Sequence, residues 1–407
     1  MPTGWPFSLA ARSSDRAGSK MQRENRETNT MALVNKVLVI GGGIGGMCAA
    51  IMLRRQGVEV DLLEVNPQWA PDGAGITISG PTLRALREIG VVEEVLRRGG
   101  SWSAVDICDA NGQLNVTVPT APTVGAEDLP GGAGIMRTVL AGILGNATQQ
   151  AGANVRLGLN FEKIEQDESG AEVLFTDGSR GRYELVIGAD GVNSAVRRLV
   201  VPDFAGSAFT GQGSWRAVVP RVRENSTIYM GKTTKAGMNP ISATECYLFV
   251  LDKRDGTDFI PPEEWPSTLA GLLEEFGGAI GEFRARLLDG SVSHHRVLYR
   301  PLAGHMIEAP WHKGRIVLLG DAVHATTPHL ASGAGMAVEG AIVLAQELSR
   351  RHSVEGALTA YAGRHYDRAR LVVNASCRMG LLEQHGGSRE EHTRVMVEAQ
   401  QALRRPL

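Results

Sequence analysis

Hydrophobic side chains along this chain alternate between short strand-like runs and stretches of helical spacing. Residues 36–40 are mostly β-branched or leucine, and residues 58–63 form a second run of the same kind that alternates with acidic positions. Between them, apolar side chains recur at helical spacing from Gly45 to Gln56, and Gly57 follows as a helix terminator. A strand, a helix and a second strand in this order predict an α/β fold built on a parallel sheet.

The patterning changes twice further along the chain. Residues 204–300 contain alternating runs at 214–219, 226–230 and 245–251, which predict an antiparallel sheet. Beyond residue 335, helical patterns cover 336–350 and 354–378. The remaining expected elements are helices over 81–90 and 91–99 and one beginning at Arg137, and strands over 103–108, 113–118, 154–157, 162–165, 172–175, 184–187 and 315–319.

The first strand leads into a glycine-rich turn, Gly41-Gly42-Gly43-Ile44-Gly45-Gly46. In such a turn Gly41 allows the tight bend, Gly43 lets a pyrophosphate approach, and Gly46 lets the helix pack against the strand. Ile44 precedes the helix that begins at Gly45, and the N-terminus of this helix favours an anion. The second strand ends at Glu64, 23 residues after Gly41, where a carboxylate accepts from a ribose and repels a 2′-phosphate. These residues therefore predict a binding site for the adenosine diphosphate part of a cofactor. Because Glu64 repels a 2′-phosphate, this cofactor is not expected to be NADP.

A second strand-to-glycine segment lies about 280 positions later. Residues 315–319 lead into Gly320 and Asp321, and Pro328 follows before the helix start Gly333-Ala334-Gly335-Met336. A third strand, 184–187, leads into Asp190, with Ser194 placed to cap a following helix. A dinucleotide fingerprint combined with a distant Gly-Asp segment points to FAD rather than to a nicotinamide dinucleotide as the bound cofactor.

Composition and charge narrow the class of protein. A chain of 407 residues suits two domains, and a net charge of -2 with a pI of about 6.6 gives no basic surface for nucleic acid. The four cysteines are widely spaced, which indicates neither a metal site nor a disulfide framework. No apolar run reaches the roughly 18 residues of a membrane span. We therefore expect a soluble cytoplasmic protein, monomeric or homodimeric, without a nucleic-acid, membrane or metal partner.

These three motifs, in this order over about residues 36–378, resemble those of the single-component flavin-dependent monooxygenases, the aromatic hydroxylase family typified by para-hydroxybenzoate hydroxylase. The resemblance implies a Rossmann-like FAD-binding domain of the glutathione-reductase type, with an inserted antiparallel-sheet substrate domain and C-terminal helices. The expected boundaries are 34–102, 131–203 and 301–353 for the FAD-binding domain, 103–130 and 204–300 for the substrate domain, and 354–407 for the C-terminal helices. Residues 1–33 are polar and lack an apolar period, which predicts a disordered N-terminal extension.

The same resemblance assigns further contacts with the cofactor. The loop that contains Gly75 is expected to pass the isoalloxazine, Arg137 to lie near the flavin, and Asp190 to touch the pyrophosphate region and the NAD(P)H path. Asp321 is expected to accept a hydrogen bond from a ribityl hydroxyl, and Pro328 to lie beside the flavin C4a atom. The chain departs from the family where Gly333-Ala334-Gly335-Met336-Ala337 replaces the usual Gly-Gln-Gly-x-Asn, so binding there is expected through backbone N–H groups.

The activity implied by the resemblance is hydroxylation of an electron-rich aromatic or heteroaromatic small molecule. NAD(P)H would reduce the flavin, O₂ would give a C4a-hydroperoxyflavin, and the ring would take up its distal oxygen, while the protein orients the substrate and excludes water. A flavin-dependent reductase of an alkene-type substrate and a non-catalytic FAD-binding protein remain alternatives. A disulfide reductase would need a second fingerprint and a redox cysteine pair, and neither occurs in the sequence.

The sequence identifies pocket candidates but no catalytic acid or base. His329 follows Pro328, and Trp215 and Arg216 lie on the expected inserted sheet, where they could stack on or clamp an anionic ring. A buried core tryptophan is the other interpretation of Trp215. His324 is expected to be a packed, hydrogen-bonded histidine, and His294 and His295 are expected on a strand before Tyr299.

Overall fold

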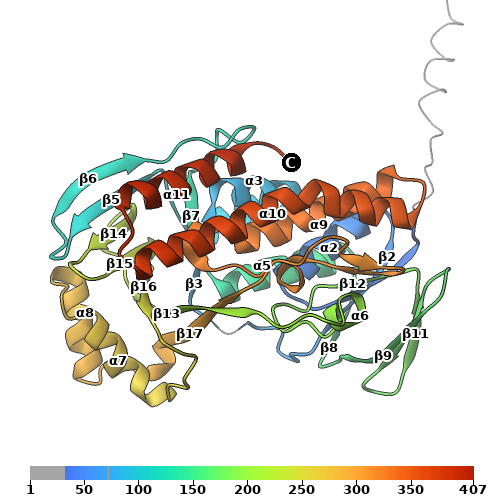
Figure 1. Ribbon diagram of the computed structural model, residues 1–407, viewed down its shortest axis with the longest axis horizontal. Helices are drawn as coiled ribbons and strands as arrows, with labels where there is room; N and C mark the ends of the chain where they lie inside the picture. The colour runs from blue at the N-terminus through green and yellow to red at the C-terminus, as the bar shows by residue number, and fades with distance from the viewer. Residues whose placement is uncertain (1–32, 72) are drawn as a thin grey trace, which may run out of the picture.

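The computed structural model describes residues 33–71 and 73–407 (Figure 1). The expected disorder of the N-terminal extension therefore falls, for residues 1–32, outside the described part of the chain. Among the described residues, no helix is both long and apolar enough to cross a membrane.

A six-stranded sheet carries the three glycine segments, in the order β18-β19-β12-β1-β2-β8. Strands β1, β2, β8, β12 and β19 run parallel, and β18 is antiparallel to β19. The strands are β1 (Lys36–Ile40), β2 (Glu59–Glu64), β8 (Asn154–Leu157), β12 (Leu185–Gly188), β18 (His312–Lys313) and β19 (Ile316–Leu318). Because β12 lies between β1 and β19, the three glycine segments leave the sheet at neighbouring carboxyl ends, where ligands of α/β sheets bind.

Helices pack against this sheet because its strands are apolar on both faces. Val37 to Val39 and Leu185 to Ile187 are fully buried, as expected for parallel strands covered on both sides. The glycine-led helix α2 packs against both α5 and α9, and α10 packs on α9 (Figure 1). The helices of this part are α2 (Ile44–Arg55), α3 (Gly80–Ile89), α4 (Val92–Arg98), α5 (Arg137–Gln150), α6 (Arg197–Val200), α9 (Gly333–Arg350), α10 (Val354–Gln384) and α11 (Arg389–Arg404).

Two three-stranded sheets flank the central one, in the orders β3-β7-β4 and β11-β10-β9. Their strands are β3 (Gly75–Ser79), β4 (Gly100–Trp102), β7 (Gly132–Met136), β9 (Phe161–Gln166), β10 (Ala171–Phe175) and β11 (Arg180–Tyr183). Strand β3 is the one that matters for the site, because it begins at Gly75 in the loop expected to pass the flavin.

The expected second sheet has seven strands in the order β17-β13-β16-β15-β14-β5-β6. Its pairs are antiparallel except for β14 with β5. One face packs on helices α7 and α8 around a separate apolar core. The elements are β5 (Ala104–Asp109), β6 (Leu114–Pro119), β13 (Ala208–Pro220), β14 (Ser226–Met230), β15 (Lys235–Pro240), β16 (Glu245–Lys253), β17 (Val297–Gly304), α7 (Trp265–Leu272) and α8 (Gly278–Leu288). The α/β class with a second antiparallel sheet and C-terminal helices is thus confirmed.

Three local expectations are wrong or incomplete. His294 and His295 lie on a short 3-10 helix (η2, His294–Arg296) rather than on a strand, because the Ser293 side chain accepts from the His295 N–H and bends the backbone. The helix after Asp190 is reduced to the single turn α6. The C-terminal helix α10 continues to Gln384, beyond the expected end at Arg378, and α11 follows it.

Candidate active site

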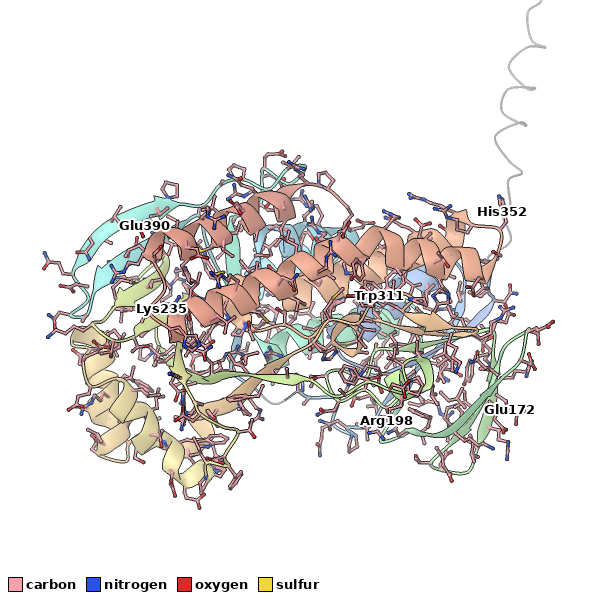
Figure 2. The ribbon with its side chains drawn as sticks, in the orientation of Figure 1. Glu172, Arg198, Lys235, Trp311, His352 and Glu390 are labelled. Atoms are coloured by element: carbon pink, nitrogen blue, oxygen red, sulfur yellow. The ribbon has the colours of Figure 1, made fainter. Side chains whose placement is uncertain are left out.

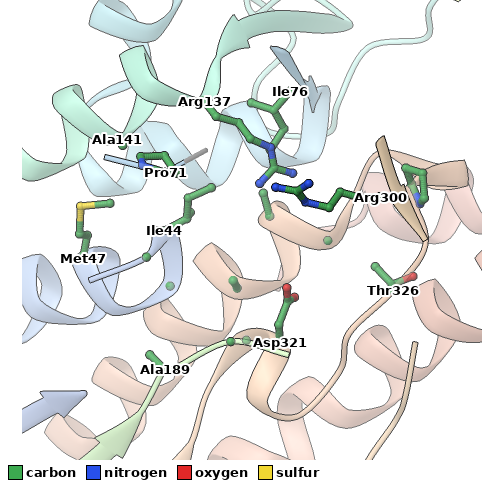
Figure 3. A pocket seen from close by; sticks show the side chains of 18 of the residues that line it. Ile44, Met47, Pro71, Ile76, Arg137, Ala141, Ala189, Arg300, Asp321 and Thr326 are labelled. Carbon is green, nitrogen blue, oxygen red and sulfur yellow. The ribbon is translucent and has the colours of Figure 1, made fainter. Parts of the chain in front are cut away.

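A cavity of about 650 Å³ lies between the three glycine segments and the inner face of the seven-stranded sheet (Figure 3). Predicted cofactor residues on its lining are Gly43, Ile44, Gly45, Glu64, Arg137, Gly320, Asp321, Pro328, Gly333 and Ala334, and Arg216 lines it from the sheet. The predicted residues that are not on the lining are Gly41, Gly46, Gly75, Asp190, Gly335, Met336, Trp215 and His329. Segments far apart in sequence thus converge on one space.

The glycines of the first turn divide into two kinds. A Cβ on Gly41 would lie 2.4 Å from the Ala189 carbonyl oxygen, and the φ angle of +107° at Gly41 also favours glycine. A Cβ on Gly46 would lie 1.9 Å from the Gly41 carbonyl oxygen. Around Gly43, in contrast, no protein atom lies within 4 Å of the added Cβ. Gly41 and Gly46 therefore allow backbone packing, while Gly43 leaves open space at the N-terminus of α2, as a pyrophosphate requires.

Glu64 lines the cavity and is held by the same turn. Its carboxylate accepts hydrogen bonds from the Gly42 N–H at 2.9 Å and the Asn66 N–H at 2.8 Å. The indole of Trp69 donates to the Gly42 carbonyl at 2.8 Å. Each carboxylate oxygen can accept a second hydrogen bond, so Glu64 can still receive a ribose hydroxyl.

The guanidinium group of Arg137 and the carboxylate of Asp321 line the cavity from different elements (Figure 3). Burial raises the pKa of Asp321, an effect that the positive charge of Arg137 reduces. Burial also lowers the pKa of Arg137, with a further lowering from Arg216, and the Nε of Arg137 is buried without a hydrogen-bond partner among the described residues. An unsatisfied buried donor and a carboxylate that line the same cavity fit a polar ligand that supplies the missing partners, such as a ribityl-phosphate chain.

The start of α9 presents its backbone to the cavity at Gly333 and Ala334. Gly335 instead faces Thr82, whose Oγ1 would lie 2.2 Å from an added Cβ, and Met336 is buried in a small apolar cluster. Gly333 and Ala334, at the start of this helix, carry N–H groups that can donate to an electronegative ligand edge. Such donors can take the place of the side chains that the Gly-Ala-Gly-Met-Ala sequence lacks.

Asp190 does not reach the cavity with its carboxylate. Its oxygens accept from the Ser194 hydroxyl at 2.5 Å and from the N–H groups of Ala195 and Val196. Ser194 in turn accepts from the Arg197 N–H at 2.9 Å, but it is not the expected cap, because Val196 occupies the N-cap position of α6. Ala189 and Gly191, on either side of Asp190, line the cavity instead. The segment therefore contributes backbone to the site, and the Asp190 side chain fixes the shape of its loop.

The inner face of the seven-stranded sheet supplies the opposite wall. We call this group, Ser214, Arg216, Tyr247, Leu298 and Arg300, the sheet wall. Its members share one face because Arg216 pairs across strands with Leu298, and Ser214 pairs with Arg300. Figure 3 shows the guanidinium groups of Arg137 and Arg300 directed toward one another.

Two pocket candidates are corrected by this geometry. Trp215 alternates with Arg216 on β13 and so points to the other face, where it is fully buried, packs against the ring of Tyr299 and donates to Asp252 at 3.0 Å. His329 turns away from the cavity, with its Nε2 3.3 Å from a Glu383 carboxylate oxygen, although Pro328 before it lines the cavity. Sequence reasoning missed Tyr247 and Arg300. Side chains alternate between the two faces of a strand, and the alternation that places Arg216 inward could have selected Arg300 as well.

His324 is packed as expected, but it lacks the expected hydrogen bonds. Its ring is 1% exposed, lies near Trp311 (labelled in Figure 2) and His365, and neither ring nitrogen has a partner among the described residues. Burial lowers the pKa of His324 to about 4. The histidine is therefore neutral in the folded protein at ordinary pH.

This neutral histidine predicts acid sensitivity of the fold. Below the free-histidine pKa of about 6.5 the unfolded chain binds a proton that the folded chain does not, so stability falls as the pH drops from about 6.5 toward 4. At pH 5 the loss from His324 alone should be roughly 2 kcal/mol relative to pH 7. Urea unfolding of wild type and of His324→Phe at pH 7 and pH 5 measures this loss. The free energy of unfolding of the variant should fall by roughly 2 kcal/mol less than that of wild type between the two pH values. Equal losses in the two proteins would contradict the assignment.

Comparison with known proteins agrees with the site. A family model described as an FAD binding domain matches residues 35–376. The putative FAD-dependent monooxygenase YetM of Bacillus subtilis is 31% identical over 348 residues, covering 84% of this chain and 91% of that protein. The 2-heptyl-3-hydroxy-4(1H)-quinolone synthase of Pseudomonas aeruginosa strain UCBPP-PA14 is 31% identical over 319 residues, covering 76% and 80%. The crystal structure of Klebsiella pneumoniae HpxO with FAD and uric acid shares the fold, with a TM-score of 0.77 at 23% identity over 91% of this chain and 92% of that one.

The family match and the cavity geometry lead to the same cofactor. The open space at Gly43, the free hydrogen-bonding capacity of Glu64 and the opposite charges of Arg137 and Asp321 on the cavity lining all suit FAD. The chain belongs to the family of FAD-binding-domain proteins that includes the single-component FAD-dependent monooxygenases, and it is an FAD-dependent monooxygenase.

Proposed function

We propose that this monooxygenase uses NAD(P)H and O₂ to hydroxylate an electron-rich aromatic or heteroaromatic small molecule. The observation that supports this most directly is that one cavity has two chemically different sides. One side carries the glycine turns and helix N-termini suited to FAD, and the other is the sheet wall, with Arg216, Tyr247 and Arg300. A small ring compound fits between a flavin on the first side and the polar groups of the second. Relatives whose names or structures include a quinolone and uric acid support a heteroaromatic substrate.

The chain's own residues have separable tasks in this reaction. Bound FAD supplies the redox chemistry, which accepts a hydride from NAD(P)H and activates O₂. The N–H groups at Gly333 and Ala334 stabilise negative charge by donation and by the helix dipole. Leu298 and Leu302 give the reaction space an apolar lining that limits water. Because the sequence holds one dinucleotide fingerprint, we infer that NAD(P)H binds only transiently, outside the FAD site.

The test is a search for a compound that accelerates NAD(P)H oxidation and receives oxygen from O₂. Phenols, hydroxybenzoates, hydroxypyridines and hydroxyquinolines are added to the FAD-loaded protein under ¹⁸O₂, with ¹⁸O-labelled water as the matched control. We expect one class to stimulate NAD(P)H oxidation and to gain one labelled atom from O₂. Label from water only, or product formation that continues without O₂, would instead support an FAD-dependent reductase or a hydratase-like activity.

A further inference from the structure

Beyond the cavity, the inner face of the seven-stranded sheet continues as a line of apolar positions. The line starts beside Arg216, which lines the cavity on β13 and pairs directly with Phe249 on β16. Phe249 pairs with Gly237 on β15, and Gly237 pairs with Ile228 on β14. Directly paired residues of neighbouring strands point to the same face of a sheet. These positions therefore lie side by side on the face that borders the cavity.

The line continues to the free edge of the sheet. Ile228 pairs with Ile107 on β5, and Ile107 pairs with Val116 on β6, the edge strand (Figure 1). We call Phe249, Ile228, Ile107 and Val116 the apolar row. Neighbouring strands lie about 4.8 Å apart, so the row from β16 to β6 spans about 19 Å. It thus joins the cavity to the edge of the sheet.

The apolar row is partly open to solvent although its side chains are hydrophobic. Phe249, Ile228 and Ile107 are half-buried, and Val116 is 50% exposed. The two large apolar cores of the described residues include none of the four, and helices α7 and α8 pack on the other face of the sheet. The ring of Phe249 fills the space above Gly237, because a Cβ added there would lie 2.0 Å from its Cζ atom. The row is therefore continuous across β15, where Gly237 has no side chain.

Polar contacts hold other elements on both sides of the row at β15. Two residues before Gly237, Lys235 lies 2.6 Å from a carboxylate oxygen of Glu383, near the end of α10. Two residues after Gly237, the Asn239 side chain donates to the Thr77 hydroxyl on β3 at 2.8 Å. Lys235, Gly237 and Asn239 share one face because side chains alternate along a strand. Helix α10 and strand β3 are thus anchored on either side of the row rather than on the row itself.

The chemistry of the row selects an apolar ligand. None of its four side chains is charged or can form a hydrogen bond, so a polar group placed there would lose hydration without gaining a partner. An alkyl group gains instead, because each CH₂ that leaves water strengthens binding about two- to fourfold. The centroid of the Phe249 ring lies 5.8 Å from that of Tyr247, which lines the cavity. This continuity with the cavity favours the tail of a cavity ligand over a separate partner.

We propose that the apolar row binds an alkyl tail attached to the substrate ring, which makes ring compounds with an unbranched apolar tail the preferred substrates. The inference rests on the proposed function, because it assumes that the ring itself binds at the sheet wall. Phe249 is the first row residue that a tail leaving the cavity meets, and Ile228 is the next. These two side chains therefore determine how affinity depends on the length of the tail.

The test measures affinity against tail length. Two probe series, 4-alkylphenols and 2-alkyl-4-hydroxyquinolines with methyl, propyl and heptyl tails, are titrated into the FAD-loaded protein without NAD(P)H. The Kd of each probe is read from the change in flavin absorbance. In at least one series we expect the heptyl member to bind about tenfold or more tightly than the methyl member. Equal affinity along both series, or no binding by any member, would overturn the proposal.

Substitutions at Ile228 locate the tail. Ile228→Glu places a charge in the middle of the row, so the advantage of the heptyl member should fall to about threefold or less, while the Kd of the methyl member changes less than about twofold. Ile228→Thr keeps a β-branched side chain that suits a strand, and it covers the case in which Ile228→Glu fails to fold. This second variant should reduce the heptyl advantage about twofold or more. A heptyl advantage that persists unchanged in the folded variants would place the tail elsewhere and overturn the proposal.

The matched control is Leu288→Glu on α8, because Leu288 is 58% exposed and belongs to the helices behind the sheet. This variant should keep the full dependence on tail length. Loss of that dependence in the control would mean that surface charge alone governs tail binding, which would overturn the proposal.

Two further outcomes separate this inference from its alternatives. If tail length has no effect and Ile228→Glu dissociates a dimer in sedimentation equilibrium, the row is an interface between copies of this chain and the proposal is wrong. Because binding is measured without turnover, tail-dependent binding without oxygen transfer would support this inference and contradict the proposed function. Oxygen transfer to rings without any effect of the tail would support the proposed function and contradict this inference.

Discussion

Replacing Gly46 with alanine is expected to destabilise the cofactor-free protein strongly and to weaken its binding of FAD. The added Cβ would lie 1.9 Å from the Gly41 carbonyl oxygen and 3.2 Å from a methyl group of Val39, so α2 would have to move away from β1. Overpacking in a tight core costs about 1–3 kcal/mol, and a clash with backbone should exceed that range. A loss of about 4 kcal/mol is a large part of a typical folding stability of 5–15 kcal/mol. Thermal unfolding of the cofactor-free protein measures it.

Gly43→Ala is the matched control within the same turn. No protein atom lies within 4 Å of a Cβ at Gly43, and its φ of -76° is ordinary for alanine. The melting temperature of the cofactor-free protein should therefore change little. The Kd for FAD should rise at least tenfold, because the methyl group would occupy the space that the pyrophosphate needs. If Gly43→Ala bound FAD as tightly as wild type, the pyrophosphate would have to lie elsewhere.

The cofactor side of the site was predictable because its information is local. Each glycine segment follows a short apolar strand, and in a parallel sheet the carboxyl ends of such strands lie together. The position of Glu64 at the end of the second strand can be found by counting 23 residues from Gly41. The structure changed the interpretation of individual residues, since Asp190 fixes its own loop and Gly335 packs on Thr82.

The sheet wall was less predictable because it depends on register between distant strands. Trp215 and Arg216 are adjacent in sequence, and only the pairing of β13 with β16 and β17 decides which of them faces the cavity. Tyr247 and Asn239 become neighbours through the pairing of β15 with β16, which no local sequence motif predicts. His329 follows a cavity residue, yet its Nε2 lies 3.3 Å from Glu383, near the end of a helix that is longer than expected.

Asp321→Ala should weaken FAD binding without destabilising the cofactor-free protein. The Asp321 carboxylate lines the cavity at the turn after β19, and its side chain is exposed there rather than packed in the core. Removing the carboxylate should therefore leave the melting temperature of the cofactor-free protein nearly unchanged. A hydrogen bond to a charged group contributes about 1.5–3 kcal/mol, so the Kd for FAD should rise about 10- to 150-fold.

The pH dependence distinguishes a hydrogen-bonding carboxylate at Asp321 from a capping one. Because the pKa of Asp321 is raised, its carboxylate takes up a proton at a higher pH than an ordinary aspartate with a pKa near 3.9. The affinity of wild type for FAD should therefore fall as the pH drops through that raised pKa, and Asp321→Asn should not show this fall. Fluorescence titration of free FAD at several pH values measures both proteins. If Asp321→Ala instead lowered the melting temperature and left the Kd for FAD unchanged, Asp321 would be a cap of its own turn, because a group that supports only the backbone stabilises the fold and not the ligand.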